Sequence, residues 1–231
     1  MASRPGILLQ ARMASTRLPG KALELIEGRP LLEHCLRRLL SAGVARVVLA
    51  TTVLEEDSVL CDLATRLGVA VYRGSASDVL ARMAKAADAF DLNPVIRATG
   101  DNPAVDIEAP GRALAAMREL RVDYVCESGL PVGAAVEAVT RDALLRSARE
   151  ANGPDDREHV TTWVKRRNDL WNLAFPAAPA PLHRADLRVT VDTPGDLAYV
   201  RSLYARAGTE QPSLRALIDA AEPVKQKREV A

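Results

Sequence analysis

The sequence is poor in aromatic residues, in cysteine and in net charge. Aromatic side chains make up 3% of the 231 residues, and the formal net charge is +1. This balance gives no overall field that would attract nucleic acid or an anionic membrane, so we expect neither partner. The 3 cysteines and 3 histidines are widely spaced, which predicts neither a zinc site nor a disulfide framework.

Long apolar runs are also absent. No stretch approaches the roughly 20 residues that cross a bilayer, and the N-terminus lacks the apolar region of a secretory signal. We therefore expect a cytoplasmic protein without a membrane segment. A chain of 231 residues, 48% of them hydrophobic, suffices for one domain with a sizeable core.

Over the first 120 residues, continuous apolar segments alternate with amphipathic ones. The pattern predicts strands at 5–11, 46–52, 69–74 and 94–100, and helices at 30–43, 55–68, 77–90 and 107–120. Gly43 and Gly68 are expected to end the first two helices, and Ser77 to begin the third. This alternation predicts an α/β protein with a doubly wound, mostly parallel sheet, in which ligands bind at the carboxyl ends of the strands.

The pattern changes near residue 121. We expect short strands within 122–140, helices at 141–153 and 155–169, a strand at 170–176, a loop at 175–186, a strand from 187 followed by a helix, and a last helix before a frayed tail at 224–231. We predict one domain over 1–231, with an α+β excursion at about 121–185. This excursion is expected to fold over the strand ends or against a partner subunit.

The segment LLQARMASTRLPGKAL, residues 8–23, leads from an apolar strand into a loop that holds Arg12, Arg17 and Lys21. Backbone amides and three cations at the ligand-binding edge of a sheet suit a polyphosphate. The loop matches neither GxxxxGK[ST] nor GxGxxG. From the residues alone, a surface loop with incidental cations stays an alternative.

Two carboxylates are expected where strands end. Asp101 follows a buried strand in IRATGDNPAVD, and Asp192 follows an alternating apolar segment in LRVTVDTPGDL. Magnesium commonly takes one or two protein carboxylates together with phosphate oxygens, so neighbouring strands would bring the two aspartates to one metal. The alternative role for such residues is helix capping, which we expect of Asp106 and of Thr193. A cap at Thr193 would leave Asp192 free to face the site.

These segments, together with YRGSASDVLARM and REHVT, occur in the order seen in nucleotide-sugar cytidylyltransferases. The chain resembles the spore coat polysaccharide branch of that family, which is related to the enzymes that make CMP-Kdo and CMP-sialic acids. The resemblance extends over about residues 5–200 and implies a Rossmann-like nucleotidyltransferase. It implies transfer of CMP from CTP to an acceptor with release of pyrophosphate, by Mg²⁺-assisted in-line attack on the α-phosphorus. It also implies a homodimer, with the excursion as acceptor lid and dimer interface.

The resemblance assigns catalysis to Arg12, Lys21 and Asp101, and magnesium binding to Asp101 and Asp192. The predicted nucleotide site consists of Gln10, Ala11, Arg12, Ser15, Arg17, Lys21, Gly74, Ser75, Arg97 and Gly100. The predicted acceptor site consists of Asp78, Arg82, Glu137, Arg157, Glu158 and His159. From their spacing of four alone, Asp78 and Arg82 would equally suit a surface ion pair on one helix.

Ala135, in GAAVEAV, departs from the family pattern, because the spore coat branch usually carries an aspartate there. An aspartate at this position would bind sugar hydroxyls. The acceptor is therefore either a sugar or sugar acid, as the resemblance implies, or a small phosphonate or carboxylate. Two further alternatives stay open: a non-catalytic nucleotide-binding module, and a uridylyl- or guanylyltransferase, although the loop resembles the cytidylyl branch rather than GGxGxRL.

Overall fold

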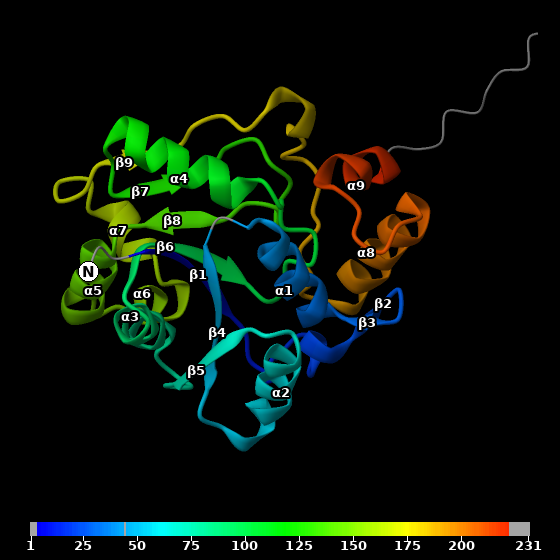
Figure 1. Cartoon of the computed structure of the whole chain (residues 1–231), viewed down its shortest axis with the longest axis horizontal. Helices are drawn as coiled ribbons and strands as arrows, with labels where there is room; N and C mark the ends of the chain where they lie inside the picture. The colour runs from blue at the N-terminus through cyan, green and yellow to red at the C-terminus, as the bar shows by residue number, and fades with distance from the viewer. Residues whose placement is uncertain (1–3, 44, 222–231) are drawn as a thin grey trace, which may run out of the picture.

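The computed structural model describes residues 4–43 and 45–221 and contains a central seven-stranded sheet (Figure 1). Its strands are β1 (Arg4–Gln10), β4 (Arg46–Thr52), β5 (Ala70–Gly74), β6 (Leu92–Thr99), β7 (Tyr124–Cys126), β8 (Glu137–Val139) and β9 (Leu173–Ala174). The strand order is β5-β4-β1-β6-β8-β7-β9, with β8 antiparallel to both of its neighbours and every other pair parallel. A separate small hairpin pairs β2 (Leu25–Ile26) with β3 (Arg29–Pro30).

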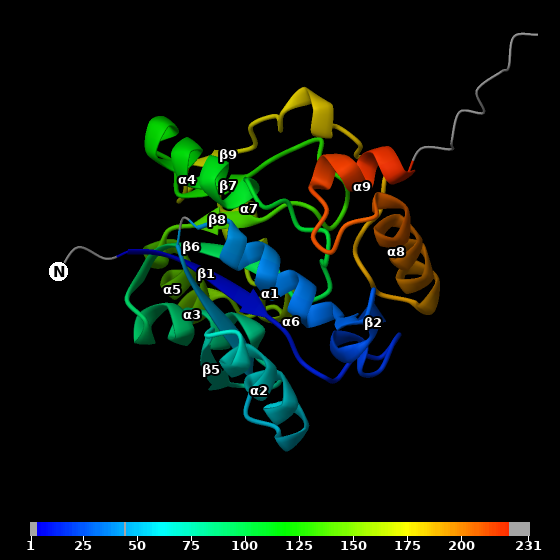
Figure 2. The same ribbon diagram turned by 45° about the vertical axis from the view of Figure 1, so that its right-hand side comes forward.

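Helices cover both faces of the sheet (Figures 1 and 2). One face carries α1 (Leu31–Ser41), α2 (Ser58–Arg66), α4 (Ala109–Leu120), α8 (Pro194–Ala207) and α9 (Leu214–Ala221). The other carries α3 (Val79–Ala89), α5 (Arg141–Glu150), α6 (Pro154–His159) and α7 (Thr162–Arg166). Ile7 and Leu9 of β1 pack into the first core and Leu8 into the second, as alternation along a strand requires. The predicted α/β, doubly wound, mostly parallel sheet is confirmed.

Most elements of the first half lie where the apolar pattern predicts them. β4 covers the predicted residues 46–52, and Gly43 and Gly68 follow α1 and α2 with φ of 64° and 72°, a left-handed conformation that favours glycine. The predicted start of α3 at Ser77 is wrong: Asp78 is its N-cap, because its side chain accepts a hydrogen bond from the backbone N–H of Ala81.

The helix predicted at 155–169 is wrong, since α6 and α7 are separate. Val160 lies between them with φ 57° and ψ −57°, and the backbone N–H of Thr161 donates to the carbonyl of His159 at 2.6 Å. These features define a classic γ-turn, a strained conformation that is rare for a β-branched residue. The turn redirects the chain immediately after His159.

The strand predicted from residue 187 is also wrong. The segment is extended but makes only an isolated bridge, from Arg188 to Val132, because its neighbours are loops instead of strands. The N–H of Val189 donates to the carbonyl of Val132, and the N–H of Val191 to the carbonyl of Asp101, both at 2.8 Å. The segment therefore runs beside the loop that follows β6, which brings Asp192 close to Asp101.

Two expected helix caps have different outcomes. Thr193 is the N-cap of α8 and forms a reciprocal capping box with Asp196, as predicted. The expected cap at Asp106 is wrong, because the N-cap of α4 is Glu108. Asp106 instead pairs with Arg112 and accepts a weak hydrogen bond from the N–H of Glu108. The expected tail at 224–231 lies outside the described residues. Among residues 4–43 and 45–221, no helix is long and apolar enough to cross a membrane.

Candidate active site

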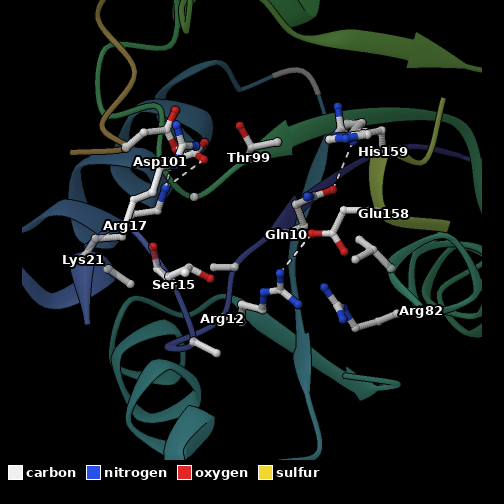
Figure 3. A pocket seen from close by; sticks show the side chains of 18 residues that line it. Gln10, Arg12, Ser15, Arg17, Lys21, Arg82, Thr99, Asp101, Glu158 and His159 are labelled. Carbon is white, nitrogen blue, oxygen red and sulfur yellow. Dashed lines mark hydrogen bonds and ion pairs between the residues drawn. The ribbon is translucent and has the colours of Figure 1, made fainter. Parts of the chain in front are cut away.

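A cavity of about 340 Å³ lies at the carboxyl ends of β1 and β6 (Figure 3). Gln10 and Thr99, the last residues of these strands, are paired in register and both line it. Gly100 follows directly, and a Cβ there would lie 2.7 Å from the Cβ of Ala11. Only glycine permits this close approach of the two strand ends, which forms the floor of the cavity.

The loop after β1 is held by a buried carboxylate that the sequence did not single out. Asp57 has no exposed surface, accepts a 2.6 Å hydrogen bond from the backbone N–H of Met13, and is also hydrogen-bonded to the N–H and the hydroxyl of Thr52. Gly20, with φ 72°, closes the loop by donating its N–H to the carbonyl of Met13. Asp57 therefore fixes the loop that presents Arg12 and Lys21.

Lys21 lies between the two predicted metal ligands, Asp101 and Asp192. Its Nζ is 3.1 Å from Oδ2 of Asp101, 3.1 Å from Oδ1 of Asp192 and 2.9 Å from the carbonyl oxygen of Val191. The Lys21 side chain is only 14% exposed. The two aspartates, 91 residues apart in sequence, therefore share one cation at the mouth of the cavity.

Further cations surround Asp192. Arg17 approaches Oδ1 at 2.8 Å and Arg188 approaches Oδ2 at 2.6 Å. Partial burial alone would raise the pKa of Asp192, but the hydrogen bond and charge of Lys21, with the charges of Arg17 and Arg188, lower it below its usual value. Asp192 is therefore ionised at neutral pH.

The opposite wall of the cavity carries two arginines (Figure 3). Nη2 of Arg12 pairs with Glu158 at 2.9 Å, which links the loop after β1 to α6. Arg82 of α3 is buried, donates to the carbonyl of Ser75, and has a lowered pKa because of burial and the nearby charge of Arg12. The Nε of Arg82 is buried without a hydrogen-bond partner among the described residues. This wall therefore has an unsatisfied donor and excess positive charge.

Arg97 of β6 lines the cavity and is held from behind by Glu137 of β8. Its Nε donates to Oε1 of Gln10 at 3.0 Å, and its Nη1 to Oε2 of Glu137 at 2.5 Å. Burial alone would raise the pKa of Glu137. The charges of Arg97 and Lys165, with hydrogen bonds from Tyr124 and Thr161, lower this pKa to about 2. The other Glu137 oxygen accepts from Tyr124, Thr161 and Lys165. Glu137 therefore has its hydrogen-bonding capacity occupied within the fold.

The structure brings most of the predicted residues to this cavity. Those that line it are Gln10, Ala11, Arg12, Ser15, Arg17, Lys21, Arg82, Arg97, Gly100, Asp101, Glu158, His159 and Asp192. Those that do not are Gly74, Ser75, Asp78, Glu137 and Arg157. The cavity is completed by Ala14, Thr16, Ala22, Val79 and Thr99, for which sequence reasoning had assigned no role and which no chemical signal in the sequence marks.

Asp78 and Arg157 form a 3.2 Å ion pair beside the cavity. The surface ion pair of Asp78 with Arg82 is therefore wrong, since Asp78 caps α3 and Arg82 is buried. Ala135 packs against the larger hydrophobic core and does not line the cavity.

The donor set around Lys21 suits a hard divalent cation. Two carboxylates and a carbonyl oxygen, which are ligands that such cations prefer, surround the Lys21 ammonium. Among residues 4–43 and 45–221, no cluster of three or more His, Cys, Asp or Glu could hold a metal. Magnesium suits a site with only two carboxylates and a carbonyl oxygen, because it usually completes its coordination with phosphate oxygens and water.

A doubly wound sheet, with a cationic cavity at the carboxyl ends of β1 and β6 and two aspartates beside it, is typical of a nucleotidyltransferase. The chain belongs to the cytidylyltransferase family, whose model matches residues 7–228.

Named relatives and a solved structure agree with this assignment. The spore coat polysaccharide biosynthesis protein SpsF of Bacillus subtilis is 33% identical over 215 residues, which cover 90% of this chain and 89% of that protein. A 3-deoxy-manno-octulosonate cytidylyltransferase of Mesorhizobium japonicum is 38% identical, over 90% of this chain and 79% of that protein. A cytidylyltransferase structure from Leptospira borgpetersenii superposes with a TM-score of 0.84 at 28% identity, over 94% of this chain and 93% of the other.

Proposed function

We propose that this enzyme transfers CMP from CTP to a small anionic acceptor, a sugar or sugar acid, and releases pyrophosphate. The observation that carries the proposal is the Lys21 ammonium held between Asp101 and Asp192, at the mouth of a cavity that also contains Arg12 and Arg17. A metal–triphosphate complex needs cationic side chains and metal-binding carboxylates at one site. The named relatives that act on 3-deoxy-manno-octulosonate support a sugar acid as the acceptor.

Arg12, Arg17 and Lys21 would hold the triphosphate through charge-assisted hydrogen bonds, with Ser15 beside them in the loop. Asp101 and Asp192 would hold Mg²⁺, which supplies neutralisation of negative charge on the phosphates when it is bound. Because such transfers need mainly positioning and charge stabilisation, these side chains suffice for in-line displacement of pyrophosphate.

The acceptor would lie toward α6, where Glu158 and His159 line the cavity. A sugar hydroxyl must lose its proton as it attacks the α-phosphorus, and the imidazole of His159 can receive that proton. Arg82 and Arg97 are the cations on this side of the cavity, and they favour an acceptor with negative charge. A small phosphonate or carboxylate is the alternative acceptor, because Ala135 stands where the spore coat branch usually carries an aspartate.

We also propose the homodimer and the lid that the family resemblance implies, and the cytoplasmic location expected from the sequence. A homodimer would use residues of about 121–185 as its interface, and Arg157 and Glu158 belong to the same segment as the predicted lid. A cytoplasmic location accords with a reaction that consumes CTP.

The test is pyrophosphate release from CTP in the presence of Mg²⁺ and a panel of sugar acids. We expect turnover by the wild-type enzyme, none by Asp101→Ala, and a reduction of orders of magnitude in Lys21→Ala. Asp219→Asn, which removes only an exposed partner of Arg215 on α9, is the matched control and should retain full activity. Near-normal turnover by folded Asp101→Ala would overturn the metal assignment.

A further inference from the structure

Every donor of the Lys21 ammonium is used inside the protein. Its three N–H groups match three acceptors, the oxygens of Asp101, Val191 and Asp192, at 2.9 to 3.1 Å. The side chain is 14% exposed, so little water reaches it. The ammonium is thus enclosed by oxygen ligands of the kind that bind magnesium.

We propose that the Lys21 ammonium occupies, in the unliganded enzyme, the position that the divalent metal takes in the nucleotide complex. The metal alone is then excluded, and it binds together with the triphosphate. This inference rests on the proposed function, because it assumes that Asp101 and Asp192 are the metal ligands.

Competition follows from the shared oxygens. Oδ2 of Asp101 and Oδ1 of Asp192 both contact Nζ of Lys21, and a metal that used these oxygens would meet the ammonium at a repulsive distance. Rotation of the Asp192 carboxylate offers the metal no unpaired oxygen, because Oδ2 is paired with Arg188 at 2.6 Å. Metal binding through Oδ2 of Asp101 and Oδ1 of Asp192 therefore requires Lys21 to leave.

A bound triphosphate would provide new hydrogen-bond acceptors for Lys21. Lys21 and Arg17 both belong to the loop that lines the cavity, and phosphate oxygens there would accept the hydrogen bonds that the aspartates release. Binding of the nucleotide then frees Oδ2 of Asp101 and Oδ1 of Asp192 for the metal. Nucleotide and metal are consequently coupled with positive cooperativity, and each strengthens the binding of the other by the same factor.

The experiment measures Mn²⁺ binding in the absence of nucleotide, by the electron paramagnetic resonance signal of free Mn²⁺. We expect weak binding by the wild type and binding at least about tenfold tighter by Lys21→Met. Arg17→Gln is the matched control, since it removes one positive charge from Oδ1 of Asp192, the oxygen that Lys21 contacts, but leaves the ammonium and the Arg188 pair in place. This control should gain less than about threefold. Equal Mn²⁺ affinities of Lys21→Met and the wild type would overturn the proposal.

A second variant guards against misfolding caused by two unneutralised aspartates. Lys21→Gln retains side-chain N–H donors for Asp101 and Asp192 while it removes the charge, and it should also bind Mn²⁺ more tightly than the wild type. Adding Asp192→Asn to either variant should abolish the gain. If the wild type turns over CTP and neither variant gains Mn²⁺ affinity, this inference alone fails. If the variants gain affinity and no acceptor is cytidylylated by the wild type, only the proposed function fails.

Discussion

Replacing Glu137 by glutamine tests how the fold holds Arg97 at the cavity. The Glu137 side chain is 12% exposed and accepts hydrogen bonds from Arg97, Tyr124, Thr161 and Lys165. These contacts lower its pKa from 4.5 to about 2 in spite of burial. A difference of this size corresponds to about 3 kcal/mol of folding free energy at neutral pH.

Glu137→Gln should therefore lower the free energy of unfolding by about 3 kcal/mol, because Arg97 keeps its charge and loses its buried counterion. The sign of the pH dependence follows from the lowered pKa. The contribution of Glu137 is complete above its unfolded pKa of about 4.5 and is lost as the pH falls toward 2. By pH 3.5 the difference between the wild type and Glu137→Gln should shrink by about 1.4 kcal/mol.

Urea denaturation of both proteins between pH 6 and pH 3.5 measures this difference. Other carboxylates titrate alike in the two proteins, so they cancel in the comparison. The variant should also show a raised KM for CTP, since Arg97 is no longer fixed against Gln10. A difference below about 1 kcal/mol, or one that does not change with pH, would refute the assigned role of Glu137.

Two further predictions concern the loops around the cavity. Asp57→Ala should cost about 2 to 4 kcal/mol in urea denaturation and raise KM for CTP, because the buried N–H groups of Met13 and Thr52 lose their acceptor; an unchanged KM would contradict its role in holding the loop. Val160→Gly should be at least as stable as Val160→Ala, although glycine ordinarily costs about 0.5 to 1 kcal/mol, because only glycine relieves the left-handed strain at this residue. If the glycine variant melts well below the alanine variant, the backbone at residue 160 is not strained.

The strands that are buried on both faces were the easiest part of the fold to predict. β1 and β4 are continuous apolar runs bounded by polar residues, so their limits are clear in the sequence. The segment from residue 187 has an equally good alternating pattern, but whether it becomes a strand depends on its neighbour. That neighbour is the loop around Gly133, where a Cβ would lie 2.6 Å from the backbone nitrogen of Thr190.

The chain order of the motifs was sufficient to bring the triphosphate loop, Asp101 and Asp192 into one hypothesis. Their adjacency was not predictable from spacing, because it depends on the hydrogen bond from Val191 to the carbonyl of Asp101. The buried carboxylates that support the site could not be predicted from the sequence either. In the sequence, Asp57 is one of several acidic residues at a helix start. Nothing around Glu137 in the sequence indicates that its side chain accepts hydrogen bonds from four residues.

The most direct test of the central claim is the mass of the product formed from CTP, Mg²⁺ and a panel of sugar acids and small phosphonates. We expect a CMP conjugate of a sugar acid, formed by the wild type, absent with Asp101→Ala, and not replaced by a UMP or GMP conjugate when UTP or GTP is supplied. CTP binding that does not require Mg²⁺, with no conjugate from any acceptor, would contradict it and indicate a nucleotide-binding module instead.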